Sequence, residues 1–194
     1  KVVAQWTKTF VIKLGVIDGR TGWVIARRSA WATWRKHVRL RVLNEGAIPP
    51  PRRVLVTRTD ALGDLVVTLP LVRALKEAHP EVEVDLLVRG YAVPVARQAL
   101  GADRVVEWTA TMADRPGDAG AEALRQGGYD VSIHAFPDAA VLKAAHRAGI
   151  PMRIATGRRW QGLRYAPHRC WDSRRASGGH EAWHGLRLLL PLNI

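Results

Sequence analysis

The stretch Arg53-Val-Leu-Val-Thr-Arg58-Thr-Asp60-Ala-Leu-Gly63-Asp64-Leu-Val-Val-Thr-Leu-Pro70 decides the fold class of this chain. Its β-branched, apolar run at 54–56 ends in a polar turn that contains one glycine. Beyond the turn, apolar residues recur at helical spacing, at Leu65, Leu69, Val72 and Leu75. This change of pattern predicts a strand, a loop and a helix, which together open an α/β unit.

Strand-like and helix-like stretches continue to alternate beyond this unit. We expect further strands at 82–88, 104–108, 130–135 and 152–155, and helices at 93–100, 121–126, 139–148 and 181–190. Two stretches are expected to be irregular, a polar loop at 114–118 and a long arginine-rich loop at 156–180. In the last helix, we expect a core-facing stripe of Trp183, Leu186 and Leu190. The alternation predicts a parallel, doubly wound, Rossmann-like α/β sheet.

Residues 1–46 differ in composition from the rest of the chain. They hold four of the eight tryptophans, and ten lysines and arginines against two acidic residues. From Gly22 onward, apolar residues recur every three or four positions, which predicts an amphipathic helix. With tryptophans on one side and cations on the other, residues 20–43 suit an anionic membrane surface. The alternative is a helix that packs on a neighbouring domain with a solvated basic face.

A proline run, Pro49-Pro-Pro51, predicts a stiff and extended spacer. We therefore expect a basic, tryptophan-rich helical arm at 1–46, a linker at 47–52 and a Rossmann-like domain at 53–194.

Composition and charge narrow the classes of function. The 194 residues are 47% hydrophobic, which is ample for a core. The net charge of +13 and the pI of about 11.1 indicate an anionic partner, namely nucleic acid, a phosphorylated sugar or an acidic membrane surface. No apolar run approaches the roughly 20 residues that span a bilayer, and no signal segment opens the chain. We expect a cytoplasmic protein, and the lysine at position 1 suggests a piece of a longer chain.

Two carboxylates are candidate functional groups. Asp60 and Asp64 lie in the predicted loop, or on the first turn of the helix, at the carboxyl end of the first strand. In open parallel sheets the ligands bind at this edge. Backbone N–H groups and the helix dipole keep a carboxylate ionised there, so that it can accept a proton. The alternative is structural, with Asp64 as an N-cap and Asp60 in an Asx-turn.

Several segments resemble, in order and spacing, the amino-terminal half of glycosyltransferase family nine, the lipopolysaccharide heptosyltransferases. They are the strand at 54–56, Gly63-Asp64, Thr68-Leu-Pro70, the strand at 82–88 followed by Tyr91, and Tyr129-Asp130-Val-Ser-Ile133. The similarity continues through His180-Glu181-Ala182 to Leu188-Leu-Leu-Pro191-Leu, and thus covers residues 52–194. Separately, Gly15, Asp18, Gly19 and Gly22 match a turn in the carboxyl-terminal tail of some family-two glycosyltransferases of lipopolysaccharide core assembly.

The resemblance implies an inverting transfer of heptose from ADP-heptose to a hydroxyl group of the lipopolysaccharide inner core. It also implies a GT-B fold of two facing Rossmann-like halves, of which the amino-terminal half holds the acceptor. Asp64 matches the general base of the family, while Thr59, Asp60 and Gly63 match its acceptor loop. Lys143 and Arg147 lie where the family carries basic residues that meet acceptor phosphates.

The resemblance leaves other positions open. His134 stands where many relatives have an acidic or polar residue, and the His180-Glu181 pair recurs in the family without a role that position alone assigns. The chain stops near the passage from the first family domain to the second, so we expect it to be inactive alone.

No metal site is expected, because the histidines lack ligand spacing and the sequence has no Asp-x-Asp motif. The resemblance implies a donor, which is ADP-heptose or another nucleotide sugar, and no further cofactor. The expected partners are this donor and a lipopolysaccharide-core acceptor, at the inner face of the bacterial inner membrane. The alternative is a basic nucleic-acid-binding module, based on the charge and on the mixture of arginine and tryptophan at 156–180. Against it, the chain carries no recognisable nucleic-acid motif. A dinucleotide site is rejected because 59–64 has one glycine where that motif needs three.

Overall fold

The structure is a computed structural model that describes residues 51–114, 118–156, 164–170, 180–192 and 194. The chain divides into two compact units, Lys1–Pro49 and Pro50–Ile194, and all described residues belong to the second. The predicted arm at 1–46 and its helix at 20–43 lie outside the described residues, as do 115–117 of the predicted polar loop.

Strands and helices alternate along the described chain. The first half runs β1 (Arg53–Arg58), α3 (Leu62–Val66), α4 (Leu69–Ala78), β2 (Glu83–Val88), the 3-10 turn η2 (Gly90–Ala92), α5 (Val93–Ala96), β3 (Arg104–Glu107) and α6 (Ala110–Asp114). The second half runs α7 (Ala119–Gly127), β4 (Val131–His134), α8 (Ala139–Arg147), β5 (Met152–Thr156), β6 (His168–Cys170), α11 (Glu181–Leu186) and the 3-10 helix η3 (Arg187–Leu192).

All strand pairs in the sheet are parallel, and the strand order is β3-β2-β1-β4-β5-β6. The chain first moves outward from β1 to β3 and then returns to place β4 beside β1. The strand order therefore reverses between β1 and β4, and the loops that follow these two strands diverge there. This topology confirms the predicted Rossmann-like α/β sheet. Its switch point lies at the carboxyl ends of the neighbouring strands β1 and β4.

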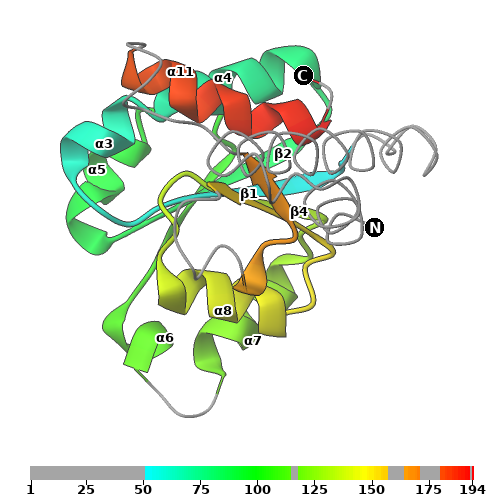
Figure 1. The fold of residues 1–194 in the computed structure, drawn as a ribbon. Coiled ribbons are helices and arrows are strands. Elements are labelled where there is room, and N and C mark those ends of the chain that lie inside the picture. The colour runs from blue at the N-terminus through cyan, green and yellow to red at the C-terminus, as the bar shows by residue number, and fades with distance from the viewer. Residues whose placement is uncertain (1–50, 115–117, 157–163, 171–179, 193) are drawn as a thin grey trace, which may run out of the picture. The chain divides into compact units, whose positions relative to one another are not determined.

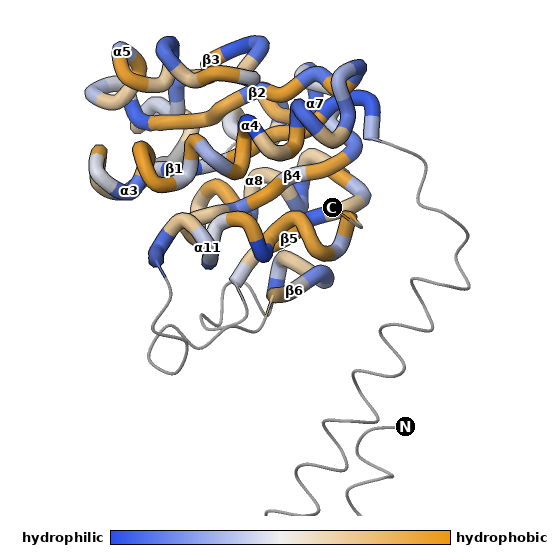
Figure 2. The backbone as a smooth tube through the Cα atoms, turned by 90° about the horizontal axis from the view of Figure 1, so that it is seen from above, coloured by the Kyte–Doolittle hydropathy of each residue, from blue (hydrophilic) through white to orange (hydrophobic). Residues whose placement is uncertain are grey.

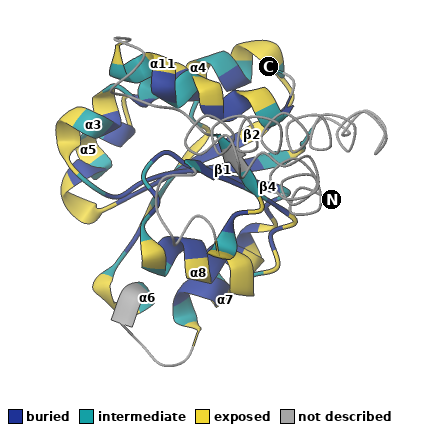
Figure 3. Cartoon of the chain, viewed as in Figure 1, coloured by how far each residue is buried: buried dark blue, intermediate teal, exposed yellow. Residues whose placement is uncertain are grey.

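Helices cover both faces of the sheet (Figure 1). α3, α4, α5 and α11 lie on one face, and α6, α7 and α8 on the other. Right-handed crossovers produce this arrangement, because connections that run in opposite directions from the switch point fall on opposite faces. Figure 3 shows buried residues along the strands and exposed residues on the outer sides of the helices.

The face toward α4 and α11 is apolar over most of its width. The side chains of Val54 and Val56 both point toward it. The register aligns them with Val84 and Leu86 of β2 and with Val131 and Ile133 of β4. Figure 2 shows the long hydrophobic run of β2 beside β1. A strand buried on both faces needs such near-continuous apolar residues.

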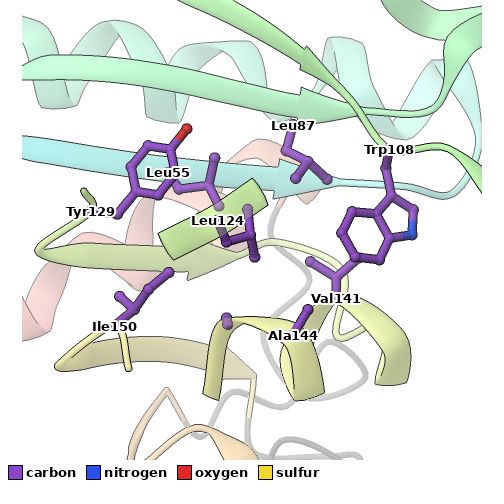
Figure 4. Close-up of a cluster of buried hydrophobic side chains, with 9 residues drawn as sticks. Leu55, Leu87, Trp108, Leu124, Tyr129, Val141, Ala144 and Ile150 are labelled. Carbon is purple, nitrogen blue, oxygen red and sulfur yellow. The ribbon is translucent and has the colours of Figure 1, made fainter. Parts of the chain in front are cut away.

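A hydrophobic cluster fills the space between the opposite face and the helices α7 and α8. Side chains from β1, β2, α7 and α8 converge there, with Trp108 next to Val141 (Figure 4). Gly120 allows α7 to approach closely, because a Cβ there would lie 2.6 Å from the Trp108 ring. This face also carries polar groups, since Leu55 aligns with Asp85 on one side and with Ser132 on the other.

The helix predicted after β1 is divided in two. α3 ends at Val66, and α4 begins at Leu69 with Pro70 in its first turn. Proline is favoured in a first turn, where its missing N–H costs no hydrogen bond. The Thr68 hydroxyl donates to the Asp64 carbonyl at 2.8 Å and joins the two helices.

Three expectations for other elements are wrong. The helix expected at 93–100 ends at Ala96. Within the loop expected at 156–180, residues 168–170 form β6, which pairs with β5 through its backbone although its sequence lacks an apolar alternation. Trp183 and Leu190 are exposed rather than core-facing, whereas Leu188 and Leu189 are buried. Leu190 lies beyond the end of the α-helix at Leu186, where the tighter turn of the 3-10 helix places Leu188 and Leu189 inward. Trp183 lies on the exposed side of α11 itself.

Candidate functional site

Arg58, the last residue of β1, occupies the switch point. Its side chain is only 6% exposed, yet it carries a positive charge. Its Nη1 donates to the Ala135 carbonyl, which follows β4, at 3.3 Å. The guanidinium therefore spans the gap between the carboxyl ends of β1 and β4.

Asp60 and Asp64 both pair with this buried cation. Arg58 donates to Asp60 through two bonds, from Nε to Oδ1 at 2.6 Å and from Nη2 to Oδ2 at 2.9 Å. Arg58 Nη2 also lies 3.1 Å from Asp64 Oδ1. The Asp60 side chain is 19% exposed and that of Asp64 is 42% exposed. The site thus presents two carboxylates to solvent in front of one buried arginine.

The local structure excludes the structural alternative for Asp64, which was an N-cap. The N-cap of α3 is Ala61, and Asp64 lies within the first turn of that helix. Its carboxylate therefore does not cap the helix. In the described residues, the Asp64 carboxylate forms one ion pair, with Arg58.

Thr59 links the loop to β2 and to α8. Its hydroxyl donates to Asp138 Oδ2 at 3.0 Å, and its carbonyl accepts from Arg89 Nε at 2.9 Å. Asp138 caps α8 through Oδ1, which accepts from the Ala140 N–H at 2.9 Å. The Tyr91 hydroxyl donates to the Asp60 carbonyl. The loop that carries both carboxylates is therefore held by residues from three strand ends.

Gly63 has open space around it. A Cβ at this position would meet no atom within 4 Å, and the backbone is not left-handed. The fold of the described residues therefore does not require glycine here.

Lys143 and Arg147 do not join this cluster. Asp138 places the start of α8 at the carboxyl edge, whereas Arg147 is its last residue and pairs with Asp118 at the start of α7. Lys143 is exposed between these two ends. The structure thus brings Thr59, Asp60, Gly63 and Asp64 together and places the two basic residues further along α8.

His134 lies inside the molecule. Its Nδ1 is 3.0 Å from the Thr57 hydroxyl and its Nε2 is 3.0 Å from the Ser132 hydroxyl. Burial, together with the nearby Arg153, lowers the pKa of His134 to about 3, so the ring is neutral at physiological pH. A buried neutral ring with both nitrogens in contact with hydroxyl groups is a structural element of the sheet.

His180 is the N-cap of α11, where its Nδ1 accepts from the Ala182 N–H at 3.2 Å. A small pocket lies beside Arg58. Its lining comprises Arg58, Val67, Thr68, Ala135, Thr156, Glu181, His184, Gly185 and Leu188. The pocket therefore connects the His180-Glu181 segment with the switch point.

Sequence reasoning missed Arg58, Arg89 and Asp138 as members of this site. Each lies at or just beyond the carboxyl end of a strand, where ligand-binding residues of parallel sheets gather. Their position was a usable signal, although their mutual contacts were not. Within the described ranges, no group of three His, Cys, Asp or Glu side chains could hold a metal ion, and no helix is long and apolar enough to cross a membrane.

Comparisons with known proteins give a structural likeness only. No model of a protein family matches the chain, and no curated protein matches it in sequence. Among solved structures, a glycosyl transferase of family 9 from Veillonella parvula matches with a TM-score of 0.60 at 18% identity, over 74% of this chain and 41% of that one. Escherichia coli heptosyltransferase WaaC with ADP matches with a TM-score of 0.60 at 19% identity, over 72% and 46% of the two chains.

The ADP-heptose lipopolysaccharide heptosyltransferase II of Escherichia coli gives a TM-score of 0.56 at 18% identity, over 64% of this chain and 36% of that one. The chain thus spans less than half of the length of these three proteins. Over that part, it has the fold of family 9 glycosyltransferases and heptosyltransferases.

Proposed function

We propose that this chain is the acceptor side of a glycosyltransferase of the heptosyltransferase type. The observation that carries the proposal is the Asp64 carboxylate at the switch point, which lies beside buried Arg58 and belongs to a side chain that is 42% exposed. The fold shared with heptosyltransferases and the family-nine motif around Gly63-Asp64 support the same assignment.

The proposed reaction transfers heptose from ADP-heptose, or another sugar from its nucleotide, with inversion. The acceptor oxygen forms a bond to the anomeric carbon while the bond from that carbon to the diphosphate breaks. ADP leaves with the bonding electrons, and Asp64 takes the hydroxyl proton as general base. The leaving diphosphate requires positive charge, which we assign to the donor side of the protein rather than to the described residues.

The acceptor sugar would lie over the loop that contains Thr59, Asp60 and Gly63. The open space at Gly63, where a Cβ would meet no atom within 4 Å, supports this position. Lys143 and Arg147 would contact phosphates only of an acceptor that extends along α8, and Arg147 would have to exchange its pairing with Asp118. A lipopolysaccharide-core acceptor has anionic groups of this kind.

The sequence of the arm supports a place at the inner face of the bacterial inner membrane. Residues 20–43 would lie on anionic lipid, and the catalytic domain would remain in the cytoplasm. Nucleic acid is not proposed as a partner, because the carboxylates of Asp60, Asp64 and Asp138 at the carboxyl edge would repel a phosphate backbone.

The decisive experiment replaces Asp64 by Asn in the naturally expressed protein and measures transfer from ADP-heptose to lipopolysaccharide-core acceptor. We expect kcat to fall by about 10²–10⁴-fold, the usual contribution of a general base. Glu77→Gln is the matched control, because Glu77 is an exposed carboxylate that also pairs with an arginine, Arg73. Retention of kcat within about threefold in Asp64→Asn would remove Asp64 from the role of base.

A further inference from the structure

Arg58 binds the carboxylates of Asp60 and Asp64 with different geometry. Asp60 receives two short hydrogen bonds from the guanidinium, whereas Asp64 forms only an ion pair with it, in which Nη2 lies 3.1 Å from Oδ1. The bidentate arrangement with Asp60 is the strong form of an arginine–carboxylate pair, because two parallel N–H groups match two carboxylate oxygens.

The burial of Arg58 makes this inequality a fixed feature. A guanidinium that is almost removed from water must keep its N–H groups paired. Nη1 donates to the Ala135 carbonyl across the switch point, so the guanidinium cannot rotate toward Asp64 without losing this hydrogen bond. The orientation of the fork therefore follows from the sheet itself.

The backbones of Asp60 and Asp64 are each held by one hydrogen bond from a side-chain hydroxyl. The Tyr91 hydroxyl donates to the carbonyl of Asp60, and the Thr68 hydroxyl donates to the carbonyl of Asp64 at 2.8 Å. Both main chains are thus held in place. Among the described residues, the Asp64 carboxylate accepts no hydrogen bond, and the Asp64 side chain is more than twice as exposed as that of Asp60.

We propose that Arg58 is a positioning residue that selects Asp64, and not Asp60, as the base. Arg58 binds Asp60 as a permanent counter-ion and orients Asp64 by Oδ1, which leaves Oδ2 available to a hydroxyl group. This inference rests on the proposed function, since selection of a base has meaning only for a proton-accepting reaction. The inequality itself is a property of the described residues and is measurable without transfer.

Carbodiimide labelling with a small amine, followed by peptide mass spectrometry, measures the inequality directly. In the parent protein we expect Asp64 to be labelled at least about fivefold faster than Asp60, because a bidentate ion pair protects both oxygens of Asp60. Equal rates for the two residues in the parent protein would overturn the proposal.

Arg58→Lys then tests whether Arg58 causes the difference. A lysine keeps the charge but has no planar fork, so the ratio of the two rates should fall to within about twofold. The control is Arg73→Lys, which makes the same exchange in the exposed pair with Glu77 and should leave the ratio unchanged. A ratio that stays at fivefold or more in folded Arg58→Lys would show that Arg58 is not the cause.

Asp60→Asn keeps the proposal testable if Arg58→Lys does not fold. The neutral amide weakens the pair with residue 60, so Nη2, which already lies 3.1 Å from Asp64 Oδ1, binds Asp64 more tightly without a rotation of the guanidinium. We therefore expect labelling of Asp64 to slow by at least about threefold. Unchanged or faster labelling of Asp64 would overturn the inference. Loss of transfer in Asp64→Asn is measured separately, so failure of the proposed function and failure of this inference give different results.

Discussion

Two clusters of arginine and aspartate lie on the same sheet, one at each edge, and they are built in opposite ways. At the carboxyl edge, the arginine is buried and its two carboxylates reach solvent. At the amino edge, Asp85 is 1% exposed and its arginines, Arg53 and Arg104, reach solvent. The arginine is therefore the buried partner at the carboxyl edge, and the aspartate is the buried partner at the amino edge.

The amino-edge cluster converges on a single oxygen. Asp85 Oδ2 accepts from Arg104 Nη2 at 2.6 Å and from the Tyr129 hydroxyl at 2.7 Å, and it lies 3.5 Å from Arg53 Nη2. The first residues of β1 and β3 and the residue two positions before β4 thus meet on β2.

The difference between the clusters separates two uses of the same residue types. A buried carboxylate with three donors holds strand ends together and has no access to a ligand. Carboxylates that face solvent in front of a buried arginine can meet a substrate and accept a proton. Position along the strands, rather than residue type, therefore distinguishes the structural cluster from the candidate catalytic one.

Asp85→Asn should produce the largest loss of stability. The neutral amide would leave Arg53 and Arg104 without their common anion and would place a buried NH₂ group where Asp85 Oδ1 has no partner among the described residues. Because Arg53 and Arg104 reach solvent, the main cost is the loss of the charge-assisted hydrogen bonds to the buried carboxylate, about 3 kcal/mol of the free energy of unfolding. Urea unfolding at neutral pH measures this loss.

Glu83→Gln is the control for Asp85→Asn. Glu83 lies on the same strand and pairs with Arg53 at 3.3 Å, but its side chain is exposed. Its loss should cost less than about 0.5 kcal/mol. If the two variants were equally stable, the amino-edge cluster would not hold the strands, and the contrast with the carboxyl edge would disappear.

The sequence predicts the parts of this picture that depend on local pattern. The β-branched run at 54–56 and the turn around Gly63 gave the first strand and the place of Asp64. The burial of Arg58 could not be predicted from the sequence, because it depends on the Ala135 carbonyl, 77 residues further along the chain. Tyr129 and Asp130 were noted only as part of a motif. Their contacts with Asp85 and with the backbone N–H groups of Arg52 and Arg53 require the assembled sheet.

Helix boundaries show the same limit. Trp183 and Leu190 fit a helical stripe over 181–190, but Trp183 lies on the exposed side of α11, and Leu190 lies in the 3-10 helix that follows Leu186. Local spacing cannot indicate where such a change of helix type occurs or which side of α11 packs against α4.

His134, the last residue of β4, provides a pH-dependent test. In the native state the pKa of His134 is lowered to about 3 by burial and by Arg153, and Asp138 acts in the opposite direction. In the unfolded chain the ring titrates near 6.5, so below that pH the unfolded state binds the extra proton. Stability from neutral His134 is therefore present above pH 6.5 and is lost as the pH falls toward 3.

Between pH 7.5 and pH 5, this linkage should lower the free energy of unfolding by about 2 kcal/mol. The measurement compares urea unfolding of the parent protein and of His134→Gln at both pH values, since the variant lacks the titrating group. His146→Gln, at an exposed histidine of α8, is the control and should keep the parent dependence. An identical pH dependence in parent and His134→Gln would mean that the ring takes up its proton in the native state.

Tyr129→Phe tests the amino-edge cluster with the smallest change. Burial, and then the hydrogen bond to Asp85, raises the pKa of Tyr129 to about 12, so the hydroxyl remains a donor throughout the neutral range. Phenylalanine keeps the ring within the hydrophobic cluster and removes only that donor. Because both arginines still face Asp85, the expected loss is about 1 kcal/mol in urea unfolding. In Asp85→Asn the same Tyr129→Phe change should cost much less, because the hydroxyl no longer meets a charge; equal costs in both backgrounds would show that Tyr129 stabilises the fold through its ring alone.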